Sequence, residues 1–280
     1  DLTFEEAKDR RSHFEHDPNI HYDIFMHLPK LDIYYRAQVT ITFRLAKVSE
    51  KLFLNFKNLG TIDRILINDV YILNTYQYAE FYKDNRLYLV SDLLKLGKNK
   101  VTILFNNKYS YGKGIDSSVD KDGQFIFNVS EPNFTSNIIP CFDQPDLKAT
   151  FSLKLMINKY WQAVFIEKLK TTHNKIPIDY LEQFPPMLEN EIIHEFYTSK
   201  KIPPYLFVVI AGNYKAIESP EKYKDIEFRL FCKESSYNTM QEMSKEIFKI
   251  TRDSMETLEK LLECPFPFSK YDQIFCPVYP

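Results

Sequence analysis

The 280-residue sequence has few glycines, few cysteines and no excess of charge of either sign. Lysine and arginine total 36 against 38 aspartates and glutamates, and the formal net charge of −2 gives no indication of binding to nucleic acid or to an anionic membrane surface. No apolar run approaches the roughly 20 residues that a membrane-spanning helix needs. We therefore expect no nucleic-acid partner and no membrane span.

The four cysteines are scattered along the chain, and none forms a C-x-x-C pair; they are Cys141, Cys232, Cys264 and Cys276. This spacing is not that of a zinc ribbon or a redox motif, and it favours ordinary buried thiols. We therefore expect a reducing compartment, cytoplasmic or otherwise intracellular. Two N-x-S/T triplets, at Asn128 and Asn133, leave a secreted origin open as the alternative.

Apolar residues alternate with polar ones over much of the chain, and 44% of all residues are hydrophobic. The clearest stretch is 37–45, where every second residue is apolar, which is typical of a strand with one solvated face. Further strands are predicted over 51–56, 62–67, 86–90, 100–106, 125–131 and 151–157, with a tight turn at Asn68-Asp69. The pattern predicts a mainly β protein, built as a large antiparallel sandwich or saddle.

The pattern changes near Ser219-Pro220, where we place a boundary between a β domain (1–218) and a small, incomplete α/β segment (219–280). After the boundary we expect a strand over 226–232 and a long helix over 238–262, because apolar residues recur there at helical spacing. At the other end, Thr3 and Glu6 form a capping box ahead of a short charged helix. We predict three further segments: a glycine-rich loop over 109–124, a proline-containing surface loop over 169–191, and a strand with a glycine turn over 197–214.

Two histidine patterns raise the question of a metal site. His13, His16, His21 and His27 lie close together in sequence, but no cysteine and no further carboxylate stands at ligand spacing, so we expect no metal there. His194-Glu195 begins like the helical zinc motif H-E-x-x-H, but residue 198 is threonine and the second ligand is missing. We predict no metal ligand in this chain.

Residues 140–151, P-C-F-D-Q-P-D-L-K-A-T-F, resemble the P-C-F-D-E-P-x-x-K-A-T-F segment of the aminopeptidase N family. These are the gluzincin zinc aminopeptidases, which include the puromycin-sensitive, oxytocinase and leukotriene hydrolase branches. Residues 2–7, 204–214 and 265–273 match other parts of the family in order. The resemblance implies the amino-terminal β domain of the family followed by the start of a thermolysin-like catalytic domain. It also implies that the 140–151 turn is architectural and holds the strand before Glu131 against the β domain.

The family pattern T-Q-x-E-P matches this chain only at Glu131-Pro132. The resemblance implies that Glu131 is a substrate-binding residue, whose carboxylate would hold the protonated amino terminus of a peptide. Val129 stands where the family has glutamine, and Ser136 and Asn137 stand at the usual arginine positions. One substrate-aligning contact is therefore missing, and an exposed loop glutamate without a ligand is the alternative.

Members of the family continue into G-x-M-E-N and H-E-x-x-H, a later glutamate ligand and a catalytic tyrosine, and none of these lies in the 280 residues. We therefore predict no catalytic residue here, and zinc only where a complete catalytic domain is supplied elsewhere. The first hypothesis is a pseudoenzyme: a non-catalytic structural or interaction module in a larger assembly, with other protein chains covering 219–280. The alternative is the amino-terminal portion of an active zinc aminopeptidase that continues in another chain or beyond residue 280. A third, weaker hypothesis is a peptide-binding module that retains Glu131.

Overall fold

The computed structural model describes residues 2–72 and 81–277. Within these ranges one large sheet, the main sheet, has the strand order β13-β14-β11-β1-β2-β8-β4-β5. Its strands in chain order are β1 (Ile20–His27), β2 (Tyr34–Leu45), β4 (Thr61–Ile67), β5 (Val70–Tyr71), β8 (Gly97–Lys108), β11 (Ala149–Asn158), β13 (Leu169–His173) and β14 (Glu191–Phe196). Neighbours run antiparallel except for β1 and β11, which are parallel. The predicted mainly β, mostly antiparallel architecture is confirmed.

The alternation along β2 explains why the main sheet has a dry face. Its inward residues Ala37, Val39, Ile41, Phe43 and Leu45 are at most 1% exposed, whereas the intervening residues are half-buried. They join residues of β1, β4, β8 and β11 in the principal core. Burying one face of a sheet fixes its register, because a shift by one residue would turn every apolar side chain outward.

Two smaller sheets continue the β architecture. The second sheet has the order β12-β15-β10-β9, formed by β9 (Gly114–Asp120), β10 (Gly123–Val129), β12 (Gln162–Phe165) and β15 (Val209–Gly212). The β7 sheet has the order β3-β7-β6, formed by β3 (Phe53–Asn55), β6 (Tyr82–Lys83) and β7 (Arg86–Tyr88). Short 3₁₀ helices lie at η2 (Ser91–Leu93), η3 (Thr135–Asn137), η4 (Ile178–Tyr180), η5 (Pro204–Leu206) and η6 (Glu234–Ser236).

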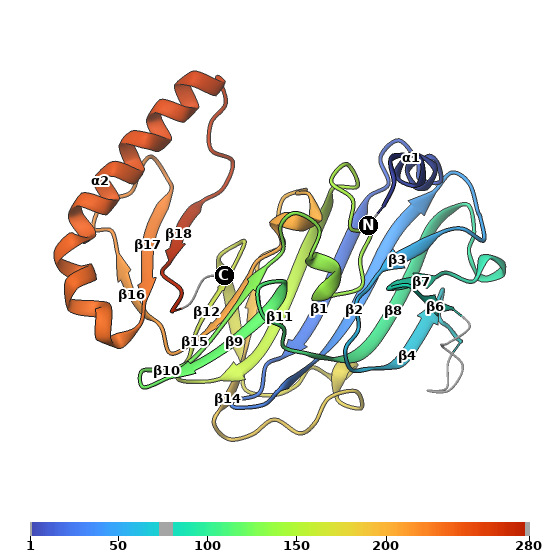
Figure 1. The fold of residues 1–280 in the computed structure, drawn as a ribbon, viewed down its shortest axis with the longest axis horizontal. Helices are drawn as coiled ribbons and strands as arrows, with labels where there is room; N and C mark the ends of the chain where they lie inside the picture. Colours follow the sequence, from blue (N-terminus) through green and yellow to red (C-terminus); the bar gives the residue numbers. More distant parts are fainter. Residues whose placement is uncertain (1, 73–80, 278–280) are drawn as a thin grey trace.

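Residues 215–277 include the described part of the α/β segment predicted over 219–280 and are called the α/β segment from here on; they lie at one end of the molecule beside the second sheet (Figure 1). Its β17 sheet has the order β16-β17-β18, formed by β16 (Lys215–Glu218), β17 (Glu227–Cys232) and β18 (Lys270–Ile274), with β17 and β18 parallel. The long helix predicted over 238–262 is confirmed as α2 (Tyr237–Leu262), which packs on one face of this sheet. Strand β16 lies just before the boundary expected at Ser219, which itself stays a prediction.

Two local predictions near the amino terminus and in the β domain are confirmed. Helix α1 (Phe4–Ser12) begins with a complete capping box: the Thr3 hydroxyl accepts from the Glu6 amide, and the Glu6 carboxylate accepts from the Thr3 amide. Asn68 and Asp69 both have positive φ, at 49° and 68°, and join β4 to β5. Asparagine and aspartate tolerate this conformation better than other non-glycine residues.

The glycine-rich loop expected over 109–124 is wrong for most of its length. Residues 114–120 are strand β9, which pairs with β10 in an antiparallel hairpin. Gly114 and Gly123 have φ values of +114° and +130° and stand at the starts of the two strands. At Gly123 a Cβ atom would lie 2.4 Å from the Asn213 side chain. The glycines therefore serve backbone conformation and close packing, and the sequence pattern was misread as a loop.

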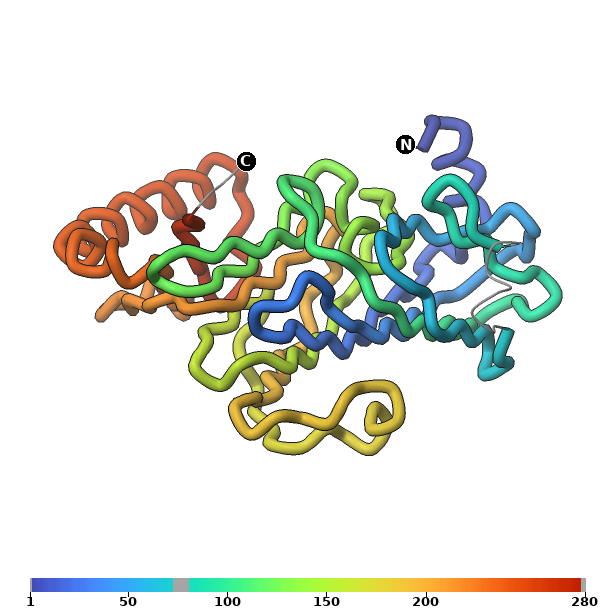
Figure 2. The backbone as a smooth tube through the Cα atoms, turned by 60° about the horizontal axis from the view of Figure 1, so that its bottom comes forward, coloured from blue at the N-terminus to red at the C-terminus, as the bar shows by residue number. Residues whose placement is uncertain are grey.

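The surface loop expected over 169–191 is also wrong in part. It begins with strand β13, and residues 174–190 then fold back over the main sheet; they lie in the yellow part of the tube that runs below the body in Figure 2. Tyr180 stacks on Phe25 with ring centroids 4.5 Å apart, and Phe184 contacts the same ring. A second apolar cluster forms under this segment. The aromatic residues Tyr180 and Phe184 indicated that this segment packs on the sheet, but its polar composition obscured that indication.

The strand predicted over 197–214 is shorter than expected. Only residues 209–212 form a strand there, β15, because Pro203 and Pro204 introduce the 3₁₀ turn η5. Proline has no amide hydrogen and fixes φ, so it interrupts strand pairing.

The cysteine thiols are all free, but only Cys141 and Cys232 are buried; Cys264 is exposed and Cys276 half-buried. The expectation of four buried thiols is therefore wrong for Cys264. Among the helices of the described ranges, none combines the length and apolar character needed to cross a membrane.

Candidate functional site

The residues after strand β10 place Glu131 on a firmly held stretch of backbone. The Ser130 hydroxyl donates to the Phe207 carbonyl at 3.0 Å. The Asn128 side chain donates to the same carbonyl at 2.8 Å, and its oxygen accepts from the Val209 amide at 2.6 Å. Glu131 itself is exposed, and within the described residues its carboxylate has no hydrogen bond or ion pair. A solvated carboxylate on a fixed backbone is available to accept an ammonium group.

Val129, at the position where the resemblance implies glutamine, lies at the end of β10 against an apolar cluster. The cluster combines residues of the second sheet with Phe231, Ile274 and Cys276 of the α/β segment. A valine side chain has no polar atom, so Val129 contributes packing to this cluster and no hydrogen bond. The apolar cluster therefore explains how a valine is accommodated at position 129. The side chain there cannot align a substrate through a hydrogen bond.

Ser136 and Asn137, at the two usual arginine positions, are occupied in local contacts. The Ser136 amide donates to Asp143 at 2.9 Å, and the Asn137 side chain donates to the Lys113 carbonyl at 3.2 Å. The Lys113 ammonium lies 5.1 Å from the centre of the Phe134 ring. The structure therefore brings a cation to this loop from the residue before β9, Lys113, which the sequence analysis did not single out.

Asp116 is a second carboxylate that the sequence analysis missed. It lies opposite Phe127 in the β9–β10 pairing, and so on the same face as Val129. It is 7% exposed, and burial raises the pKa of its carboxyl, while a 2.7 Å hydrogen bond from the Gly112 amide opposes that rise. Its sequence signal was a charged residue placed two positions after the strand-initiating Gly114.

The turn at 140–145 is tied to the core through its phenylalanine. Phe142 is fully buried, and its ring makes edge contacts with Phe14 and Phe43, with centroids 5.0 and 5.2 Å apart. Its amide donates to the Tyr22 hydroxyl at 2.9 Å. These contacts join the turn to β1 and β2 of the main sheet.

The polar residues of the same turn bind helix α1 and the loop after Glu131. Asp143 accepts from the Ser136 amide, and burial raises the pKa of its carboxyl. Gln144 accepts from Arg10 Nε at 3.0 Å and donates to the Ala7 carbonyl at 3.0 Å. Arg10 is 3% exposed, and burial lowers its pKa to about 10. These contacts tie the turn to α1 and to the loop after Glu131, while its predicted role of holding the strand before Glu131 stays a prediction.

The described residues (2–72 and 81–277) do not fit a zinc ion. His194 and Glu195 are consecutive on strand β14, so their side chains alternate across the sheet, and Glu195 is engaged by Lys170 at 2.8 Å and His173 at 2.7 Å. No group of three potential ligands was found in the described residues. Structural and catalytic zinc sites need three or four converging protein ligands, so we derive no chemical step through zinc from these residues.

Three of the four amino-terminal histidines contact separate partners. His13 Nδ1 lies 2.7 Å from the Asp9 carbonyl, and His21 Nδ1 lies 2.8 Å from the Thr150 hydroxyl. His27 Nε2 lies 2.7 Å from a carboxylate oxygen of the buried Glu191. Their closeness in sequence therefore does not bring their ring nitrogens to one point.

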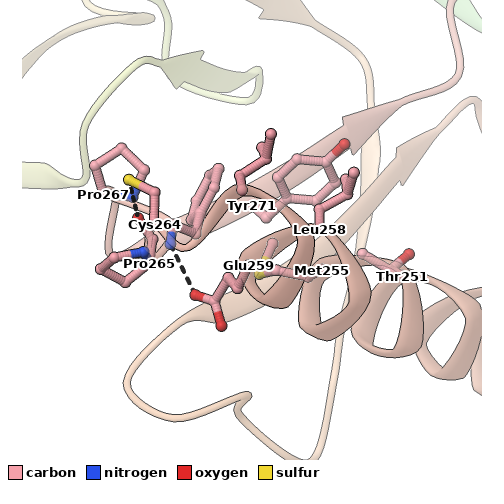
Figure 3. A pocket seen from close by; sticks show the side chains of 10 residues that line it. Thr251, Met255, Leu258, Glu259, Cys264, Pro265, Pro267 and Tyr271 are labelled. Carbon is pink, nitrogen blue, oxygen red and sulfur yellow. Dashed lines mark hydrogen bonds between the residues drawn. The ribbon is translucent and has the colours of Figure 1, made fainter.

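An apolar pocket of about 260 Å³ lies along α2 and the loop that follows it (Figure 3). The Glu259 carboxylate at its edge accepts from the Phe266 amide at 2.7 Å and from the Tyr223 hydroxyl at 2.8 Å. A hydrogen bond from Lys224, together with those from Phe266 and Tyr223, lowers the pKa of Glu259 to about 2. The lining residues are Thr251, Met255, Leu258, Glu259, Leu262, Cys264, Pro265, Phe266, Pro267 and Tyr271. This surface is suited to apolar contact.

Several known proteins are similar in sequence to this chain. The model of the peptidase M1 N-terminal domain matches residues 18–206. Aminopeptidase N of Streptomyces lividans is 23% identical over 250 residues, which cover 88% of this chain and 26% of that protein. Leucyl aminopeptidase of Saccharolobus solfataricus is 26% identical over 166 residues, or 59% of this chain and 19% of that protein.

A third relative is the Tricorn protease-interacting factor F2 of Thermoplasma acidophilum, which is 27% identical over 183 residues, or 65% of this chain and 21% of that protein. The chain thus spans about a quarter or less of the length of these three relatives. The family model, in contrast, covers well over half of the chain in one continuous range, and it includes the 140–151 turn and Glu131. The chain therefore belongs to the peptidase M1 family, of which it contains the N-terminal domain.

Proposed function

We propose that the chain is a non-catalytic structural and interaction module of a peptidase M1 protein. The observation that supports the interaction role is the exposed apolar surface of α2, where Leu258, Leu261 and Leu262 are 52%, 75% and 66% exposed. Apolar surface of this kind, continuous with the pocket of Figure 3, is stabilised when another polypeptide surface removes it from water. The partner that the proposal requires is a protein chain with an apolar face.

Self-association of the isolated chain tests this proposal. Without a partner, exposed apolar residues on α2 favour association between copies. We expect light scattering after size exclusion to show oligomers or aggregates, and Leu262→Glu to increase the monomer fraction. The matched control is Ile178→Glu, because Ile178 is 82% exposed but lies in η4, away from α2 in sequence. A monodisperse, cooperatively melting wild-type monomer contradicts the proposal.

The second candidate is the amino-terminal portion of an active zinc aminopeptidase, with Glu131 as a binding group for the substrate amino terminus. The observation that favours it is the unengaged carboxylate of Glu131 on a fixed backbone, together with relatives named aminopeptidases. The zinc ligands would come from residues outside the described chain. Zinc bound to the complete protein, with cleavage of an aminoacyl chromogenic substrate, would establish this candidate and exclude the non-catalytic one.

A binding measurement on this chain separates a peptide-binding role from a purely structural one. We expect a peptide with a free amino terminus to bind more tightly than its acetylated form if Glu131 holds the ammonium, and Glu131→Gln to remove that difference. Glu50→Gln is the control, because Glu50 is an exposed glutamate in a separate turn. Equal binding of both peptides by the wild type eliminates the ammonium-binding role.

A further inference from the structure

Charged side chains are buried together where the β17 sheet meets the second sheet. Lys270 and Asp272 are two residues apart on β18 and therefore point to the same face, and Arg229 lies opposite Asp272 on β17. The side chains of Lys270 and Asp272 are only 6% and 4% exposed. Lysine and aspartate are seldom buried to this degree unless each is paired and hydrogen-bonded.

Each charge in this group has a partner. The two nitrogens Nε and Nη2 of Arg229 donate to the two oxygens of Asp272, at 2.8 and 2.7 Å. The Lys270 ammonium pairs with Asp272 and also donates to the carbonyl oxygen of Phe165 at 2.7 Å. Phe165 is the last residue of β12 in the second sheet. The Lys270 ammonium is therefore bonded to both sheets at once.

The other contacts described between these two parts are apolar, or polar with side chains more exposed than those of Lys270 and Asp272; Asp122, 4.0 Å from Lys233, is the least exposed of them at 10%. Phe231 and Ile274, farther along the same strands, join the apolar cluster that also contains Val129. Ion pairs between Lys168 and Glu227 and between Lys233 and Asp120 connect the same two parts of the chain, but their side chains are about a third exposed. Apolar contact is non-directional and exposed ion pairs contribute little, so neither fixes one orientation strongly.

We propose that Lys270 is a positioning residue that fixes the orientation of the α/β segment on the second sheet through the Phe165 carbonyl. A buried polar group of this kind contributes direction, because its hydrogen bonds are satisfied in only one arrangement. The same contact fixes the positions of β18 and α2 relative to the end of β10. This inference is independent of whether Glu131 binds a peptide.

The main test measures orientation in the full chain. Spin labels are attached to the exposed Cys264, which follows α2, and to a cysteine introduced by Ile178→Cys. Double electron–electron resonance then gives the distribution of distances between the two labels. We expect one narrow distribution in the wild-type background and a broad one after Lys270→Met. Lys260→Met is the control, because Lys260 is exposed and pairs with Glu256 within α2. An unchanged distribution after Lys270→Met overturns the proposal.

Amide exchange provides a second measurement with a rescue. Lys270→Ala leaves the Phe165 carbonyl without its donor, and we expect β17 and β18 amides to exchange roughly a hundredfold faster while β2 and β8 amides keep their rates. Added n-propylammonium should restore protection in Lys270→Ala, whereas n-propanol of similar shape should not. Equal rescue by both compounds would show that Lys270 only fills space, and this outcome overturns the proposal even if Lys270→Met fails to fold.

Discussion

The main sheet and the α/β segment differ in how completely each buries its apolar residues. The inward residues of β2 are at most 1% exposed, and part of the other face of the main sheet is covered by the chain itself, through residues 174–190. On α2, Phe248 and Met255 are buried, but three leucines at its carboxyl-terminal end remain more than half exposed. The chain therefore covers the apolar faces of the main sheet with its own residues, whereas the α/β segment leaves an apolar surface of α2 exposed.

The largest expected effect is at the centre of the β domain. Phe142→Ala should lower the free energy of unfolding by about 3–5 kcal/mol, because it removes a fully buried ring and leaves a cavity between Phe14 and Phe43. Chemical denaturation measures the change. Phe4→Ala is the control, since Phe4 is 79% exposed, and an equal loss in both variants would contradict this assignment of the core.

A smaller and more local effect is expected in the α/β segment. Met255→Ala should cost about 2–3 kcal/mol, at the lower end of the range for buried large-to-small changes, because α2 is covered on one face only. Amide exchange should show faster opening of α2 and β17 with little change in β2. Leu261→Ala, at a 75% exposed position, is the control with no measurable loss. Equal acceleration in the main sheet would mean that the two regions open together.

Helix α1 should show a loss of about 1 kcal/mol after Thr3→Ala, because the Glu6 amide loses its capping acceptor. The effect is smaller than those above because the cap is exposed. Thr3→Ser retains the hydroxyl and should retain most of the stability. Thermal melting of both variants measures the difference, and identical melting of alanine and serine variants would exclude the cap as a source of stability.

The smallest effect concerns the pH dependence of stability. It is measured on one carboxylate in helix α1 and one in the α/β segment. Hydrogen bonds from Arg86 and Thr3 lower the pKa of Glu6 from 4.5 to about 2, and contacts led by Lys224 do the same for Glu259. A lowered folded-state pKa means that the stabilising contribution is fully present above the usual pKa of 4.5. It is lost as the pH falls from there through about 2.

Carboxyl NMR titration measures both values directly. Lys224→Met should raise the pKa of Glu259 and leave that of Glu6 unchanged, and Arg86→Met should do the reverse. A pKa near 4.5 for either glutamate in the wild type would contradict the hydrogen bonds assigned to it.

Local sequence patterns predicted some of the regular elements. The alternation at 37–45, the capping box at Thr3 and the helical spacing over 238–262 each predicted an element that the structure contains. Such elements are set by neighbours in sequence, because side-chain direction repeats with a period of about 2 in strands and 3.6 in helices. The predictions were wrong where a glycine or a proline changed the local structure, as at Gly123 and Pro203, and where a polar composition obscured buried aromatic residues, as over 174–190.

The candidate site was predictable only in part. Motif resemblance located Glu131 and the 140–151 turn, and the family match includes both. Resemblance did not indicate Asp116 or Lys113, because their places beside the end of β10 depend on the β9–β10 pairing. Whether Glu131 binds a substrate stays a prediction.

The sequence by itself determined the family, the mainly β fold and the position of the long helix, because these follow from motifs and from local hydrophobic patterns. Only the tertiary structure decided that residues 174–190 cover the main sheet and that β1 pairs in parallel with β11. Only the tertiary structure, too, placed the Lys270 ammonium on the Phe165 carbonyl, 105 residues away in the chain. Contacts at such separations depend on the simultaneous packing of several elements, which no local pattern records.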